Sequence, residues 1–128
     1  MDVLLDTCSF LWLIFDDDAL SQEAIDTFLD PQNVVFLSSA SSWEISVKFE
    51  LGKLSLPEKP EILVPKFREL HSIETLSISE SATFNLSKLP NRHKDPFDRI
   101  LICQAIEHSL SILTPDQLIQ QYPIRTIW

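Results

Sequence analysis

The stretch Val-Val-Phe-Leu at residues 34–37 is apolar at every position and rich in β-branched and aromatic side chains. A strand with one solvated face would alternate apolar and polar residues, whereas a parallel strand covered by helices on both sides reads as a continuous apolar run. The preceding Asp-Pro-Gln-Asn at residues 30–33 predicts a turn. We therefore interpret residues 34–37 as an inner strand of a parallel sheet.

Strand and helix patterns alternate on both sides of this segment. We expect a strand at residues 3–5, a helix starting near Ser9, and a second helix from Ser21 to just before Pro31. Residues 40–51 fit both the alternation of a strand and the stripe of a helix. We favour the helix because Gly52 stands where a glycine that ends a helix belongs.

The second half of the chain continues this alternation. We expect a helix with Pro65 in its first turn, a strand over 74–78, helices over 79–86 and 95–108, a strand over 111–113, a helix over 115–121 and a last strand over 124–127. The pattern predicts an α/β fold: a single three-layer domain over residues 1–128, whose central, mainly parallel sheet of about five strands is flanked by helices on both faces.

Composition excludes several classes of protein. The single glycine rules out glycine-rich phosphate and dinucleotide loops, and the two cysteines lack the spacing of a zinc site or a disulfide framework. The longest apolar run, residues 10–15, is far shorter than the roughly 20 residues of a membrane helix. The first residues carry no Lys or Arg, unlike a secretory signal. We expect a cytoplasmic protein that does not associate with a membrane.

The charge is distributed unevenly along the chain. The formal net charge is −9, and residues 1–47 contain no Lys or Arg. Because affinity for a polyanion comes largely from Lys and Arg, this acidity disfavours a passive nucleic-acid binder. A site built to hold a divalent cation is acidic by construction, however, and the ion reverses the local sign. A metal-dependent site therefore stays compatible with the sequence.

Four acids occupy informative positions. Asp6 follows the first strand, Glu44 lies in the helix after the second, Asp98 is in the first turn of the long helix, and Asp116 follows the strand at 111–113. In doubly wound sheets, ligands bind beyond the carboxyl ends of the strands. Converging carboxylates at that edge would suit Mg²⁺ or Mn²⁺, which prefer oxygen ligands.

Each acid also has a local explanation. Asp6 could cap a helix, and Glu44 precedes Lys48 by four residues, the favourable order for a helical ion pair. Asp98 would be favoured by the helix dipole, and Asp116 follows Thr-Pro in the same way that Asp98 follows Asp-Pro-Phe. Local capping does not explain why acids gather at one edge of the predicted sheet.

Several motifs together resemble the PIN-domain proteins of the VapC toxin type. They are Leu-Asp-Thr at 5–7, Trp-Glu-Ile at 43–45 closed by Leu-Gly-Lys-Leu at 51–54, His-Lys-Asp-Pro-Phe-Asp-Arg at 93–99 leading into Ile-Cys-Gln-Ala at 102–105, and Thr-Pro-Asp at 114–116. The resemblance spans the whole chain in order and spacing, and the first long run and the Trp-Glu-Ile helix are its more specific parts. Cys8 departs from the His of many relatives, and Pro115 replaces a residue that is often small.

The resemblance implies a metal-dependent endoribonuclease that cuts RNA, is restrained by a cognate antitoxin and forms a homodimer. Its metal-site acids would be Asp6, Glu44, Asp98 and Asp116, holding Mg²⁺ or Mn²⁺. Asp95, Thr7 and Thr114 would support these ligands, although Asp95 is better explained as a helix cap. Between residues 88 and 99, four Lys and Arg residues outnumber two acids. This basic loop suggests Arg92, Lys94 and Arg99 as contacts to the RNA backbone, with a merely solvated loop as the alternative.

Two other α/β protein classes, phosphatases and phosphate-receiver domains, fit the sequence less well. A phosphatase with an aspartyl nucleophile would need a second acid at position 8, where Cys8 stands. A phosphate-receiver domain would need adjacent acids after the first strand and a lysine near the end of the last, and neither is present. A catalytically degenerate PIN domain that only binds a protein stays an alternative. His71, His93 and His108 have no metal-ligand spacing, so we expect surface or packing roles, with His93 the best candidate for an exception.

Overall fold

The computed structural model describes residues 1–128 and contains one parallel sheet with strand order β3-β2-β1-β4-β5. The strands are β1 (Asp2–Leu5), β2 (Val34–Ser38), β3 (Glu74–Leu76), β4 (Ser111–Leu113) and β5 (Thr126–Ile127). Leu5 of the central strand lies opposite Leu37 on one side and Leu113 on the other. The predicted α/β fold with a five-stranded sheet is confirmed, and every strand pair is parallel.

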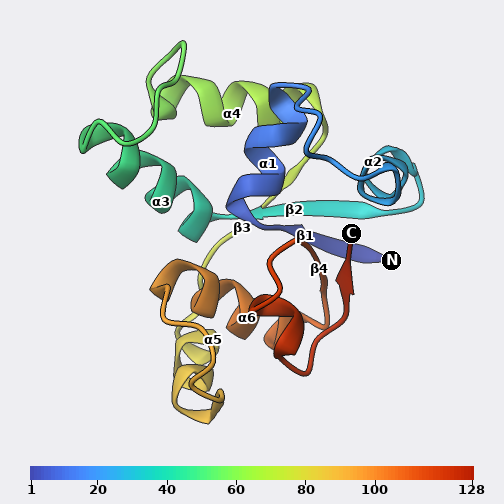
Figure 1. The fold of residues 1–128 in the computed structure, drawn as a ribbon, viewed down its shortest axis with the longest axis vertical. Helices are drawn as coiled ribbons and strands as arrows, with labels where there is room; N and C mark the ends of the chain where they lie inside the picture. The colour runs from blue at the N-terminus through green and yellow to red at the C-terminus, as the bar shows by residue number, and fades with distance from the viewer.

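Helices cover both faces of the sheet (Figure 1). One face carries α1 (Thr7–Ile14), α2 (Gln22–Leu29), α3 (Ser39–Glu50) and α4 (Pro60–Leu70), and the other carries α5 (Glu80–Phe84) and α6 (Pro96–His108). Short 3₁₀ turns occupy Asn85–Lys88 (η1) and Ile119–Gln121 (η2). None of the helices combines the length and the apolar character that crossing a membrane requires.

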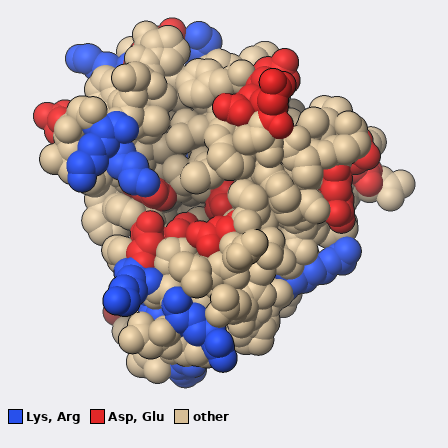
Figure 2. All heavy atoms as spheres, in the orientation of Figure 1, with Lys and Arg blue, Asp and Glu red and all other residues tan.

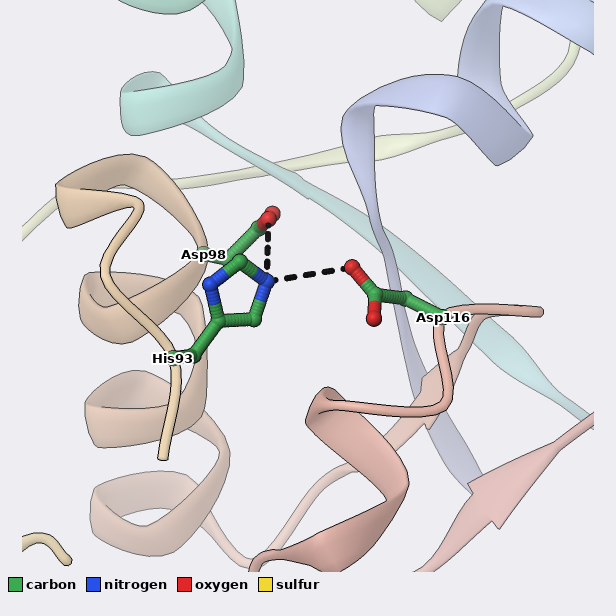
Figure 3. Close-up of side chains that lie close together, drawn as sticks. All are labelled: His93, Asp98 and Asp116. Atoms are coloured by element: carbon green, nitrogen blue, oxygen red, sulfur yellow. Dashed lines mark hydrogen bonds and ion pairs between the residues drawn. The ribbon is translucent and has the colours of Figure 1, made fainter. Parts of the chain in front are cut away.

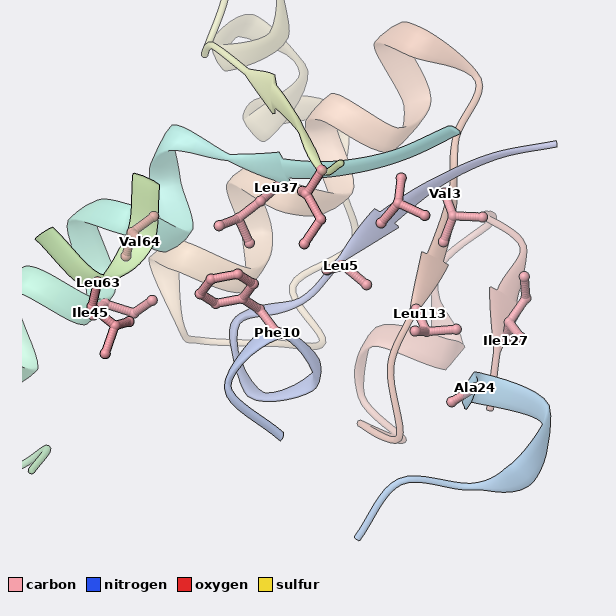
Figure 4. Packing of buried hydrophobic residues seen from close by; sticks show 12 residues of the cluster. Val3, Leu5, Phe10, Ala24, Leu37, Ile45, Leu63, Val64, Leu113 and Ile127 are labelled. Carbon is pink, nitrogen blue, oxygen red and sulfur yellow. The ribbon is translucent and has the colours of Figure 1, made fainter. Parts of the chain in front are cut away.

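Two apolar cores form because neighbouring residues of each strand point to opposite faces. Val3 and Leu5 of β1 pack with Phe10 of α1 in one core, shown in Figure 4. Leu4, between them, packs in the other core with Leu101 of α6. The covering of β1 on both faces explains why its sequence is apolar at consecutive positions.

The strand order creates a switch point beside β1. From β1 the chain adds β2 and β3 on one side, and it then returns to add β4 and β5 on the other. Loops that leave the carboxyl ends of β1 and β4 therefore diverge, and this is the position where ligands bind in such sheets. Asp6 follows β1 and Thr114 follows β4, so both stand at this crevice.

The main differences from the sequence prediction concern the first helix, α4 and the segment 115–121. The first helix begins at Thr7 rather than near Ser9, because Asp6 caps it by accepting a hydrogen bond from the Ser9 N–H. The helix α4 begins at Pro60, so Pro65 lies in its interior and not in its first turn. The predicted helix over 115–121 is wrong: only η2 forms there.

Candidate metal centre

Asp6 is held in place by two neighbours. Its Oδ1 accepts a 2.7 Å hydrogen bond from the Ser9 N–H, and its Oδ2 accepts one from the Thr114 hydroxyl. The side chain is only 4% exposed. Burial raises the pKa of this carboxyl, whereas the hydrogen bonds from Ser9 and Thr114 act in the opposite direction. Asp6 is thus a buried, oriented carboxylate that also caps α1.

Glu44 reaches the same region from α3 and is equally buried. Its Oε1 accepts a 2.7 Å hydrogen bond from the Thr7 hydroxyl, and its Oε2 forms an ion pair with Lys48 at 2.5 Å. The helical ion pair anticipated from the sequence is therefore present. Glu44 nevertheless stays buried, because the half-exposed Lys48 side chain brings its ammonium group to the buried carboxylate.

Asp98 lies in the first turn of α6, where the Asp-Pro pair at 95–96 starts the helix. The Asp95 side chain caps the helix by accepting from the Phe97 N–H, as favoured from the sequence. Burial of Asp98, followed by the negative charges of Asp95 and Glu44, raises the pKa of its carboxyl to about 7. The surroundings of Asp98 therefore favour its protonated form more than those of an exposed aspartate do.

Asp116 completes the set from the loop after β4. Thr114 links it to Asp6, because the Thr114 hydroxyl donates to Asp6 and accepts from the Asp116 N–H. The charge of Asp116 also contributes to the raised pKa of Asp6. The structure thus places Thr7 and Thr114 as hydrogen-bond donors to two of the predicted ligands.

His93 lies between two of these acids. Its Nε2 is 3.0 Å from Asp98 Oδ2 and 3.1 Å from Asp116 Oδ2 (Figure 3). The three residues form a group whose potential ligand atoms all lie within 4.8 Å of one another. Asp6 and Glu44 stand outside this tight group. His93 is 7% exposed and belongs to the site, so the expectation of a surface or packing role holds at most for His71 and His108.

Figure 2 shows a hollow that contains Asp and Glu side chains and has Lys and Arg side chains above and below it. The four predicted carboxylates come from four separate parts of the chain, and each of Asp6 and Asp98 is influenced by the charge of another member. Among the Lys and Arg side chains, only Lys48 forms a salt bridge with the set. Buried carboxylates with so little compensation fit a divalent cation, which takes oxygen ligands and offsets their repulsion.

The basic loop is divided between two roles. The Arg99 guanidinium donates to the carbonyl oxygens of Leu86 (3.0 Å), Pro90 (3.3 Å) and His93 (3.4 Å). These contacts give Arg99 a structural role in the loop, and its contact to RNA stays a prediction. Arg92 and Lys94 are exposed, so both stay available as contacts.

Cys8 lies in α1 beside the acids. It is a free, exposed cysteine. Desolvation of the thiol, followed by the negative charge of Asp6, raises its pKa to about 11. A separate pocket of about 370 Å³ lies between α3 and α4, where Ser42, Phe49 and Arg68 line it. It contains none of the predicted acids and is not the candidate site.

The sequence did not reveal the contact between His93 and Asp116. Asp116, one of its partners, lies 23 residues further along the chain, so no local spacing reveals the contact. The usable signal was its position two residues before Asp95, the residue that caps α6.

Fold and site together define an α/β protein with a carboxylate-lined crevice at the switch point of a parallel sheet. The model of the PIN domain family matches residues 3–124, and the chain belongs to that family. Over 54 residues it is 37% identical to Ribonuclease VapC16 of Mycobacterium tuberculosis. That match spans 42% of this chain and 38% of the relative, so the comparison covers less than half of either protein.

Solved structures share the fold over nearly the whole chain. VapBC2 from Rickettsia felis, bound to a DNA fragment from its promoter, superposes with a TM-score of 0.73 at 16% identity and covers 98% of this chain and 97% of that chain. DNA-bound VapBC from Salmonella typhimurium gives a TM-score of 0.69 at 20% identity, covering 98% and 96%.

Proposed function

We propose that the protein is a metal-dependent endoribonuclease and the toxin of a toxin–antitoxin pair. The observation that carries the proposal is the convergence of Asp6, Glu44, Asp98 and Asp116 at the switch point of the sheet. Membership of the PIN family and the similarity to a protein named as a ribonuclease support the reaction. The solved VapBC complexes support an antitoxin as partner. A homodimer and a cytoplasmic location are parts of the same proposal.

Asp6, Asp98 and Glu44 would hold one or two Mg²⁺ or Mn²⁺ ions, with Asp116 as a further or water-mediated ligand. Such an ion, when bound, activates a water and offsets the charge that develops on the phosphoryl oxygens during in-line displacement. Thr7 and Thr114 keep the carboxylates of Glu44 and Asp6 oriented. None of the chain's side chains is needed as a nucleophile.

Substrate binding would use exposed cations of the loop before α6. Arg92 and Lys94 are exposed on the loop that leads to Asp98. Contacts of Arg and Lys to phosphate oxygens position a nucleic acid without reading its sequence. These two residues are therefore proposed to hold the RNA backbone next to the carboxylates.

The test is cleavage of a mixed RNA pool by the wild type, Asp6→Asn and Asp26→Asn, each with Mg²⁺, with Mn²⁺ and with EDTA. Asp26 is an exposed acid of α2 that accepts from the Gln22 side chain, which makes it a matched control. Circular dichroism first establishes that all three proteins are folded. We expect metal-dependent cleavage by the wild type and the control, and none by Asp6→Asn. Cleavage that persists in EDTA or in Asp6→Asn would contradict the proposal.

The alternative function is a catalytically degenerate PIN domain that serves as a protein-binding module. It predicts a wild type that is inert toward RNA with either metal and still binds an antitoxin. Metal-dependent cleavage by the purified wild type would exclude this alternative.

A further inference from the structure

The imidazole of His93 is held through both ring nitrogens. Its Nδ1 accepts a 3.1 Å hydrogen bond from the Asp95 backbone N–H. A nitrogen that accepts from a backbone N–H carries no proton, so the ring proton of the neutral imidazole is on Nε2. This Nε2–H donates to Asp116 Oδ2 at 3.1 Å, and Asp98 Oδ2 lies 3.0 Å from the same nitrogen.

This tautomer argues against His93 as a metal ligand, although the three side chains are close enough to share an ion. A histidine that binds a metal through Nε2 needs a proton on Nδ1, which it then donates to an acceptor. At Nδ1 this ring faces the donor N–H of Asp95, part of the backbone at the start of α6. Coordination through Nε2 would place two donors against each other.

We infer that His93 is a positioning residue: its Nε2, which donates to Asp116 and lies 3.0 Å from Asp98 Oδ2, holds both carboxylates in the orientation that binds the cation. The inference rests on the proposed metal site and assigns a task there to a residue that is not a ligand. Asp98 belongs to a helix and Asp116 to a loop from another part of the chain. A shared donor between them opposes their mutual repulsion while the ion is absent.

The loop that carries His93 is itself braced. The Tyr122 hydroxyl accepts from the His93 N–H at 2.9 Å and donates to the Pro90 carbonyl at 2.8 Å. Arg99 donates to the carbonyl oxygens of the same two residues. These contacts restrict the backbone on which the imidazole stands, as a rigid support for a preorganised site requires.

The first test is calorimetric titration of Mn²⁺ into the wild type, His93→Leu, His93→Gln and His108→Gln. Removing a hydrogen-bond partner of metal ligands typically lowers metal affinity by about 10–100-fold, and we expect a loss of that size for His93→Leu. His93→Gln should recover most of the affinity, because its amide N–H₂ donates without supplying a ring nitrogen. His108, exposed at the end of α6, should be neutral when replaced. Circular dichroism verifies folding in every case.

The second measurement reads the tautomer directly, by ¹⁵N NMR of the His93 ring with and without Mg²⁺. We expect the proton to stay on Nε2 in both states. Transfer of the proton to Nδ1 on Mg²⁺ binding would make His93 a ligand and overturn the inference. Wild-type affinity in folded His93→Leu would overturn it as well.

The outcomes separate this inference from the proposed function. If the wild type binds no Mn²⁺, or if Asp6→Asn binds it equally well, the proposed metal site is wrong and the inference falls with it. If the wild type binds Mn²⁺, Asp6→Asn does not and His93→Leu binds normally, only the part assigned to His93 is wrong.

Discussion

Two opposing influences act on the pKa of the Asp98 carboxyl. It is placed at the start of α6, where the helix dipole favours a negative charge, yet its burial and the acids around it favour the protonated form and raise its pKa to about 7. The second influence prevails, since the pKa lies far above the ordinary value of 3.8. If the proposed cation binds, it removes this conflict by favouring the ionised carboxylate.

Replacing Asp98 by Asn should therefore stabilise the metal-free protein at pH 8. The amide has the same shape and removes a buried charge, and we expect a gain on the order of 1–3 kcal/mol. Urea unfolding in EDTA measures it. Mn²⁺ binding and RNA cleavage should be lost at the same time. A variant that is less stable in EDTA, or one that still cleaves RNA, would contradict this assignment.

Thr114 offers a second test at this scale. Its hydroxyl is fully buried and joins Asp6 to the Asp116 backbone. Thr114→Val keeps the shape but leaves the Asp6 carboxylate without one donor, which should cost about 1–3 kcal/mol of unfolding free energy at pH 7. Urea unfolding checks this against Thr83→Val, whose hydroxyl bonds a carbonyl in an exposed turn of α5. Equal effects of the two substitutions would contradict the role given to Thr114.

Single residues also mark the limit of prediction from sequence. The four acids could be nominated because each follows a recognisable strand or starts a recognisable helix. The bridging position of His93 and the bracing by Arg99 could not, because both depend on how a loop without periodicity folds back on the chain. Charge counting nominated Arg99 as an RNA contact, but it could not reveal that the guanidinium also donates to the carbonyl oxygens of Pro90 and His93.

At the level of elements, caps and terminators were the most informative signals. Ser21, Ser38 and Asp95 each cap the helix that follows, and Gly52 adopts the left-handed conformation after α3. Such signals act within a few residues, so a sequence reveals them directly. They also decided the ambiguous segment 40–51 in favour of a helix.

The failed helix at 115–121 has a local cause. Asp116 accepts a hydrogen bond from the Leu118 N–H through its own Oδ1, two residues away, and this arrangement competes with helical bonding. Pro123 follows closely and leaves little length for a helix. In α4, by contrast, the helix continues through Pro65. Pro65 lacks the N–H that would bond the carbonyl of Glu61, and Glu61 is an exposed residue.

Gly52, just after the end of α3, has a left-handed backbone conformation that a substitution can test. Its φ is +72°, and a Cβ added there would meet no atom within 4 Å, so only backbone strain opposes a side chain. Gly52→Ala should cost about 1–2 kcal/mol. Gly52→Asn should cost less, because Asn tolerates the left-handed region. Urea unfolding of both variants measures the difference, and an alanine variant as stable as the wild type would contradict the strain argument.

For the molecule as a whole, the strand order joins distant parts of the sequence into one site. Asp6 and Asp116 are 110 positions apart and meet only because β1 and β4 are neighbours. Strand and helix patterns predicted the layers, and the rule for parallel sheets predicted the edge. The side-chain contacts inside the crevice needed the structure.

The pH dependence of the free energy of unfolding combines the protonation of several carboxyl groups of the site. The pKa values of Asp98 and Asp6 are raised, so the folded state binds more protons than the unfolded one. In EDTA, the free energy of unfolding should therefore fall as the pH rises from about 5 through about 7. Urea midpoints at pH 5.5 and 8.0 test this. Asp98→Asn should flatten the trend, and a wild type that gains stability over this interval would contradict it.

Cys8 is not one of the proposed ligands, but the negative charges of the acids raise the pKa of its thiol. Alkylating reagents attack the thiolate, and a pKa of about 11 leaves almost none of it at neutral pH. Part of that elevation comes from the charges of Asp6, Glu44 and Asp98, which a divalent cation would neutralise. The rate at which iodoacetamide labels Cys8 should consequently increase with metal occupancy, so the native chain carries a chemical reporter of its own loading state.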